Sequence, residues 1–205
     1  MSLRNISNIV DLAYTYLGYS NQSRSDDIDK LINESIDELD KINQFKYLYV
    51  DMTERLDFIN NNPIYSSFLD GCNHYYLVIT TLGKRVDDRV KYYSVTDMKK
   101  MLVFDATCGA YLEYMADDYE KTNFKEIHTY RFCPGYQGTS TNDLRKIFEI
   151  LKPEKIGIIL NESNLMIPLK TMCGIIGFGS EKKKMCGNCD IKDKCEFRKK
   201  GKTCY

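Results

Sequence analysis

Four cysteines lie close together near the end of the chain. They are Cys186, Cys189, Cys195 and Cys204, in the pattern Cys-x2-Cys-x5-Cys-x8-Cys. Four cysteine thiolates can complete the coordination of a zinc ion or hold an iron–sulfur cluster. Because ligand identity alone does not separate these alternatives, the pattern predicts a metal site that holds either a [4Fe–4S] cluster or zinc.

A second group of residues has the chemistry to bind a small charged ligand. The segment RFCPGY (residues 131–136) begins with Arg131, whose planar guanidinium is suited to pairing with a carboxylate. Pro134 and Gly135 favour a turn, and the missing side chain at Gly135 lets the backbone approach a ligand. A longer motif, LNESNLMIPLKTMCG, follows at residues 160–174.

In this order, the two motifs resemble the activation domain of cobalamin-dependent methionine synthase, in the form in which that domain is a separate subunit. That family has Arg-x-x-Pro-Gly-Tyr followed by Leu-Thr-Glu-Ser-x-x-Met-x-Pro-x-x-Ser-x-Ser-Gly. The resemblance covers roughly residues 100–178 and extends more loosely over the chain up to Gly179. The sequence departs from the pattern at Asn161, where the family has Thr, and at Thr171 and Cys173, which occupy the two Ser positions.

The resemblance implies a site for S-adenosylmethionine. Arg131, Pro134, Gly135 and Tyr136 match the ligand-binding loop of the family, and Glu113 corresponds to a carboxylate that contacts the ligand. Tyr136 also matches the tyrosine that family members place over the corrin face, and it is therefore the predicted catalytic residue.

The resemblance also implies a reaction. S-adenosylmethionine and one electron from flavodoxin or ferredoxin would convert cob(II)alamin to methylcobalamin on a corrinoid-binding methionine synthase subunit. This need for electrons favours a [4Fe–4S] cluster in the tail, where the Cys-x2-Cys-x5-Cys core resembles the auxiliary-cluster motifs of some radical enzymes. The alternative is an iron–sulfur or zinc adaptor, or electron-transfer protein, for another corrinoid methyltransferase that does not turn over S-adenosylmethionine.

Composition limits the partners. The 205 residues include 29 basic and 29 acidic side chains, so the net charge indicates neither a nucleic acid nor a membrane surface as partner. The segment from Glu181 to Tyr205, however, contains nine basic residues and four acidic residues. This change of composition near Gly179 predicts two parts, an activation-like domain at 1–179 and a Cys-rich metal-binding tail at 180–205.

The location of the protein follows from its apolar segments. The first residues lack the apolar region of a signal peptide, and no apolar run approaches the roughly 20 residues of a membrane span. We therefore expect a cytoplasmic protein with reduced thiols. The cysteines outside the tail are then expected to be small buried hydrophobic side chains. They are Cys72, Cys108, Cys133 and Cys173.

The periodicity of apolar residues predicts an α+β fold, with a mixed or antiparallel sheet and flanking helices. Gly109 should permit close packing of a long buried helix, and Ser140 with Asp143 resembles a capping box at a helix start. The helices are expected near 5–19, 26–43, 84–93, 96–119 and 140–152, and the strands at 45–52, 75–81, 156–160, 164–167 and 172–178.

Overall fold

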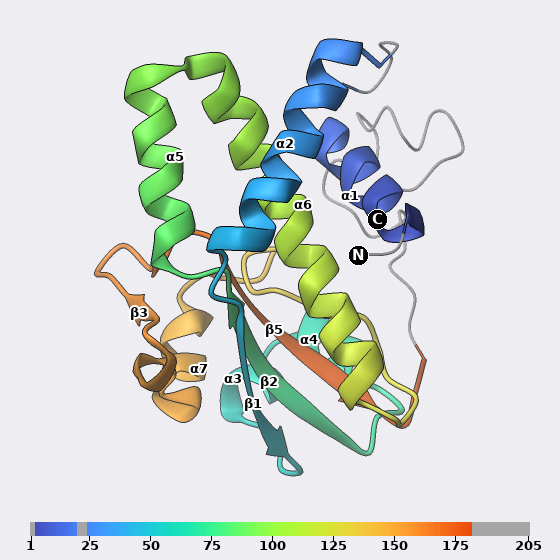
Figure 1. The fold of residues 1–205 in the computed structure, drawn as a ribbon. Coiled ribbons are helices and arrows are strands. Elements are labelled where there is room, and N and C mark those ends of the chain that lie inside the picture. The colour runs from blue at the N-terminus through green and yellow to red at the C-terminus, as the bar shows by residue number, and fades with distance from the viewer. Residues whose placement is uncertain (1–2, 20–23, 182–205) are drawn as a thin grey trace.

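A layer of helices stands at one end of a small antiparallel sheet, one long helix of this layer continues across one face of the sheet, and shorter helices lie on the other face (Figure 1). The structure is a computed structural model and describes residues 3–19 and 24–181. Its elements are α1 (Leu3–Tyr16), α2 (Asp26–Ile42), β1 (Lys46–Met52), α3 (Asp57–Asn60), α4 (Pro63–Phe68), β2 (His74–Thr81), α5 (Lys84–Thr96), α6 (Met98–Asn123), α7 (Asp143–Leu151), the 3-10 turn Pro153–Ile156, β3 (Ile159–Leu160), β4 (Met166–Ile167) and β5 (Thr171–Phe178).

The main sheet has the order β1-β2-β5, and both strand pairs are antiparallel. The central strand β2 is buried on both faces, as its nearly continuous apolar sequence predicts. Leu77 faces the side that packs against Ile147 of α7, whereas Val78 faces Phe124 at the end of α6. The two faces of the sheet therefore belong to different parts of the core.

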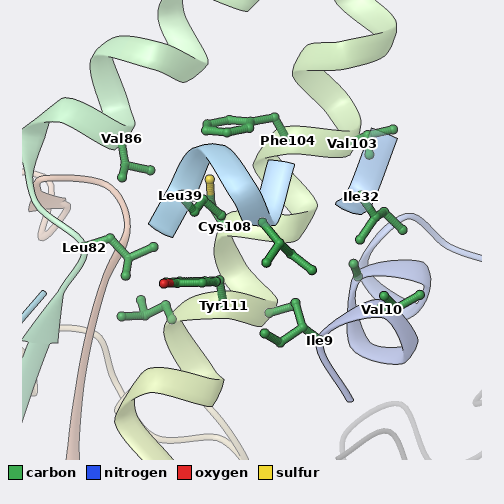
Figure 2. Close-up of a cluster of buried hydrophobic side chains, with 14 of the residues drawn as sticks. Ile9, Val10, Ile32, Leu39, Leu82, Val86, Val103, Phe104, Cys108 and Tyr111 are labelled. Atoms are coloured by element: carbon green, nitrogen blue, oxygen red, sulfur yellow. The ribbon is translucent and has the colours of Figure 1, made fainter. Parts of the chain in front are cut away.

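The helical layer has a core of its own, shown in Figure 2. At its centre lies α6, which packs against α1, α2 and α5. A Cβ atom at Gly109 of α6 would lie 3.1 Å from the ring of Tyr16, so the predicted close packing is confirmed. The labelled core residues of Figure 2 are Ile9, Val10, Ile32, Leu39, Leu82, Val86, Val103, Phe104, Cys108 and Tyr111.

Most predicted elements are confirmed, but the capping box is wrong, and the strands predicted at 156–160 and 164–167 are each reduced to two residues. The capping box does not form: α7 begins at Asp143, whose carboxylate accepts a hydrogen bond from the Tyr65 hydroxyl at 3.0 Å. The strand predicted at 156–160 is reduced to β3, because Pro153 starts a 3-10 turn that ends at Gly157 in a left-handed conformation (φ +84°). β3 pairs with β4 in a separate two-stranded sheet.

No helix in the described ranges combines the length and the apolar character that crossing a bilayer requires.

Candidate functional site

The C-terminal half of α6 presents a row of carboxylates to one arginine. Glu113, Asp117 and Glu120 are spaced so that they share a face of the helix. The chain then returns to the sheet, where Phe132 and Ile175 exchange backbone hydrogen bonds of 2.9 and 2.8 Å. This pairing fixes the backbone next to Arg131 at the edge of β5, opposite α6.

All three carboxylates accept hydrogen bonds from the guanidinium of Arg131. Its Nη2 donates to Glu113 Oε2 at 2.7 Å and to Asp117 Oδ1 at 3.2 Å, and its Nη1 donates to Glu120 Oε1. The exposed fraction of the side chain rises from 6% at Glu120 to 28% at Glu113 and 55% at Asp117. The cluster therefore extends from the interior to the surface.

Glu120 is held from a second side. The hydroxyl of Tyr47 on β1 donates a hydrogen bond to Glu120 Oε1 at 2.7 Å. Burial raises the pKa of the Glu120 carboxyl, although Arg131 and the Tyr47 hydroxyl both act to lower it. Burial acts to lower the pKa of Arg131, but the three carboxylates outweigh it, so this pKa lies above its ordinary value. Arg131 therefore stays charged.

Gly174 of β5 brings Arg131 close to the sheet. A Cβ atom at Gly174 would lie 2.6 Å from the Cγ atom of Arg131 and 2.9 Å from the carbonyl oxygen of Phe132. A side chain there would push the arginine away from β5. Gly174 belongs to the second sequence motif, but the sequence analysis gave it no role of its own.

The loop after Arg131 is held by its own hydrogen bonds. The Gly135 N–H donates to Thr139 Oγ1 at 3.0 Å, and that hydroxyl donates to the carbonyl of Tyr136 at 2.7 Å. Gly135 adopts φ +93°, and a Cβ atom on it would lie 2.9 Å from Thr141, so glycine is required. Pro134 is buried. The loop therefore presents Tyr136 in a defined conformation.

Tyr136 projects from this loop and is 68% exposed. Partial desolvation, and then the electrostatic effects of Cys133 and Glu113, raise the pKa of its phenol. Glu113 thus influences both Tyr136 and Arg131. Of the predicted ligand-binding residues, Arg131 and Glu113 are in direct contact, through the hydrogen bond from Nη2 to Oε2.

Four further residues complete the cluster, and the sequence did not predict a role for any of them. They are Asp117, Glu120, Tyr47 and Gly174. The helical spacing of the three acids was a usable signal, since it places them on one face. The burial of Glu120 could not be predicted without its partner Tyr47 on β1 and its partner Arg131, which come from distant parts of the chain.

The predicted metal ligands Cys186, Cys189, Cys195 and Cys204 lie outside the described residues. Within the described ranges, no three histidine, cysteine or acidic side chains are grouped to hold a metal ion. The prediction for the scattered cysteines is confirmed for Cys108 and Cys173, which are buried, whereas Cys72 and Cys133 are only partly buried.

A histidine between two acids lies at the other end of the sheet. The ring of His74 contacts Asp51 through Nδ1 at 2.8 Å and Glu126 through Nε2 at 3.2 Å. Partial burial acts to lower the pKa of the imidazole, but the hydrogen bonds to the two acids act to raise it and outweigh burial. The pKa of His74 therefore lies above its ordinary value. These contacts join β1, β2 and the segment after α6, and we assign them a structural role.

Among solved structures, the chain is similar in fold to a domain of a known enzyme. No protein-family model matches the chain, and no curated protein matches it. The crystal structure of the MetH reactivation domain bound to AdoHcy matches with a TM-score of 0.56 and 16% sequence identity, over 100% of this chain and 85% of that one. A likeness at this identity is one of fold. The chain therefore has the fold of the MetH reactivation domain.

Proposed function

We propose that the chain binds S-adenosylmethionine and supports reductive methylation of cob(II)alamin to methylcobalamin on a partner methionine synthase in the cytoplasm, as its reactivation subunit. The observation that carries the proposal is the Arg131–Glu113 pair beside the loop of Tyr136, in a chain with the fold of a domain that binds AdoHcy. AdoHcy is the product that S-adenosylmethionine becomes when it loses its methyl group.

The chemistry of the cluster fits the ligand. The amino-acid end of S-adenosylmethionine carries a carboxylate, which pairs with a guanidinium, and an ammonium, which pairs with a carboxylate. Arg131 is nine-tenths buried, and its Nε has no acceptor among the described residues. A buried donor without an acceptor is unusual in a folded protein, where nearly all buried polar atoms have a partner.

Binding would proceed by exchange of ion pairs at Arg131. The ligand carboxylate would take a position on the guanidinium, and Glu113 would turn from Arg131 to the ligand ammonium. Glu120 would keep its hydrogen bond to Nη1, because it is buried and also held by Tyr47. The guanidinium would therefore stay in place while its exposed partners change.

The chain supplies position and charge, while the ligand and the corrinoid supply reactivity. After one electron from flavodoxin or ferredoxin has reached the cobalt, the sulfonium methyl would pass to it and the sulfur would keep the bonding pair. Tyr136, 68% exposed on its loop, is the side chain that we assign to the corrin face of the partner.

Replacing Glu113 with glutamine tests the site. We expect affinity for S-adenosylmethionine to fall about tenfold or more, because the ligand ammonium would lose its negatively charged acceptor. Titration calorimetry measures this, and Asp118→Asn is the matched control, since Asp118 is exposed on the same helix and is not among the partners of Arg131. No binding by the wild type would overturn the proposal and favour the adaptor that does not use S-adenosylmethionine.

For the tail we keep the metal site as a proposal that rests on the sequence alone. Protein purified without oxygen should contain iron and sulfide and show the broad visible absorbance of a [4Fe–4S] cluster. Cys186→Ser with Cys189→Ser should abolish both signals. Zinc without that absorbance would contradict an electron relay, and absence of any metal would contradict the site.

A further inference from the structure

His74, at the start of β2, lies between two carboxylates that come from different parts of the chain. Its Nδ1 contacts Asp51 Oδ1 of β1 at 2.8 Å, and its Nε2 contacts Glu126 Oε2 of the segment after α6 at 3.2 Å. We infer that His74 is a pH-sensitive latch, which ties the chain between α6 and Arg131 to the sheet while its ring is protonated and releases Glu126 when the proton is lost.

The two contacts of the ring require a proton on each nitrogen. An ionised carboxylate only accepts hydrogen bonds, so each ring nitrogen that faces one must donate. A neutral imidazole has one N–H and serves one of the two acids, whereas an imidazolium has two and serves both. Since the contact with Asp51 is the shorter one, neutral His74 would keep Asp51 and give up Glu126.

Aromatic rings also pack against His74. Phe178 of β5 stacks on it with ring centroids 4.8 Å apart, and Tyr76 of β2 meets it edge-on at 5.5 Å. The second histidine, His128, packs against the same Phe178 ring at 5.7 Å. Burial among these groups disfavours the imidazolium, but the two carboxylates outweigh burial, so the pKa of His74 is raised.

Glu126 lies in the segment that leads from α6 to Arg131. This segment runs along β5, where the Thr129 N–H donates to the Gly177 carbonyl at 2.8 Å. Arg131 follows Glu126 by five residues. Loss of the contact between His74 and Glu126 therefore removes a tie at the start of the segment that supports Arg131.

The tie to Glu126 weakens as the pH rises. Because the pKa of His74 is raised in the folded protein, its stabilising effect is fully present below the ordinary histidine pKa of about 6.5 and is lost as the pH rises through the raised value. Asp51 and Glu126 are 55% and 50% exposed, so the effect is that of a surface ion pair. Such a pair changes a local opening equilibrium by about twofold to fivefold.

Nuclear magnetic resonance of the full chain tests the partners of the latch. Titration of the His74 ring should give a lower pKa in Glu126→Gln than in the wild type, because one of the two carboxylates that favour the imidazolium is gone. Glu149→Gln is the matched control and should leave this pKa unchanged, since Glu149 is exposed on α7, which packs on the other face of the sheet.

Hydrogen exchange tests the release of the segment. The Thr129 amide should become about twofold to fivefold less protected as the pH rises through the pKa of His74. The Leu82 amide, which donates to the Lys170 carbonyl at 3.0 Å beyond the other end of β2, should keep its protection. In His74→Gln, which does not titrate in this range, the pH dependence at Thr129 should disappear.

Each part of the test has an outcome that contradicts the latch. The inference fails if Glu126→Gln leaves the pKa of His74 as it is in the wild type. It also fails if the amides of Thr129 and Leu82 lose protection equally, or if the pH dependence at Thr129 persists in His74→Gln. None of these measurements involves S-adenosylmethionine, so the proposed function stands or falls separately.

Discussion

Replacing Arg131 with alanine is expected to lower the free energy of unfolding by about 3–5 kcal/mol, because it leaves a buried carboxylate without its cation. Glu120 is only 5% exposed, and after the substitution the Tyr47 hydroxyl would be its remaining partner among the contacts described above. Urea denaturation of the wild type and the variant measures the loss.

Two comparisons make this prediction specific. Arg24→Ala removes an ion pair with Asp11 whose side chains are 49% and 62% exposed, and it should cost at most about 1 kcal/mol. Adding Glu120→Gln to Arg131→Ala should recover part of the stability, because the uncompensated charge disappears. Equal stability of Arg131→Ala and the wild type would show that the cluster does not hold α6 to the sheet.

Variants that keep the fold intact are needed to measure binding of S-adenosylmethionine. Loss of S-adenosylmethionine binding in Arg131→Ala would be ambiguous, since the substitution also disturbs the fold. Glu113 and Asp117 are better probes, because their side chains are more exposed and Glu120 remains to hold Arg131.

The second large effect is expected for Gly174→Ala. Its new methyl group would meet the Arg131 stem at 2.6 Å and the Phe132 carbonyl at 2.9 Å, and a carbonyl of a paired backbone cannot move without breaking that pairing. We expect a loss of about 1–3 kcal/mol, as for an overpacked core, together with weaker binding of S-adenosylmethionine because Arg131 is displaced.

Gly109→Ala is the matched control for the second prediction. There the methyl group would lie 3.1 Å from the ring of Tyr16, and alanine favours a helix over glycine by about 1 kcal/mol. The two effects oppose each other, so the net change should be smaller than at Gly174. Thermal unfolding of both variants provides the comparison, and a Gly174→Ala protein as stable as Gly109→Ala would refute the steric argument.

Long periodic elements were predictable because their apolar positions repeat over several turns or strand pairs. The helix from Met98 to Asn123 and the strand from Thr171 to Phe178 were both anticipated within a few residues. Short elements were not: α3 and α4 have four and six residues, too few for a period to emerge. The failed capping box at Asp143 shows a further limit, since its carboxylate is bound by Tyr65 from a distant part of the chain.

The residue types of the site could be predicted from the sequence, but the contacts between their side chains could not. The motif singled out Arg131, and the resemblance singled out Glu113, yet neither indicated that these side chains bind each other. Asp117 and Glu120 lie on a helix, where acidic side chains are usually solvated, and neither belongs to a motif. Their role depends on the return of the chain to β5, which brings a cation to their side of α6.

One consequence of α6 concerns mechanics. Its 26 residues form a helix about 39 Å long. The first half packs in the helical layer, and the second half carries the three acids that form ion pairs with Arg131. Because the helix is unbroken from Met98 to Asn123, a tilt of about 5° at its first residue would displace its last residue by about 3 Å, the length of an ion pair. A change in how α1, α2 and α5 pack against α6 is therefore expected to alter the distances between Arg131 and the three carboxylates.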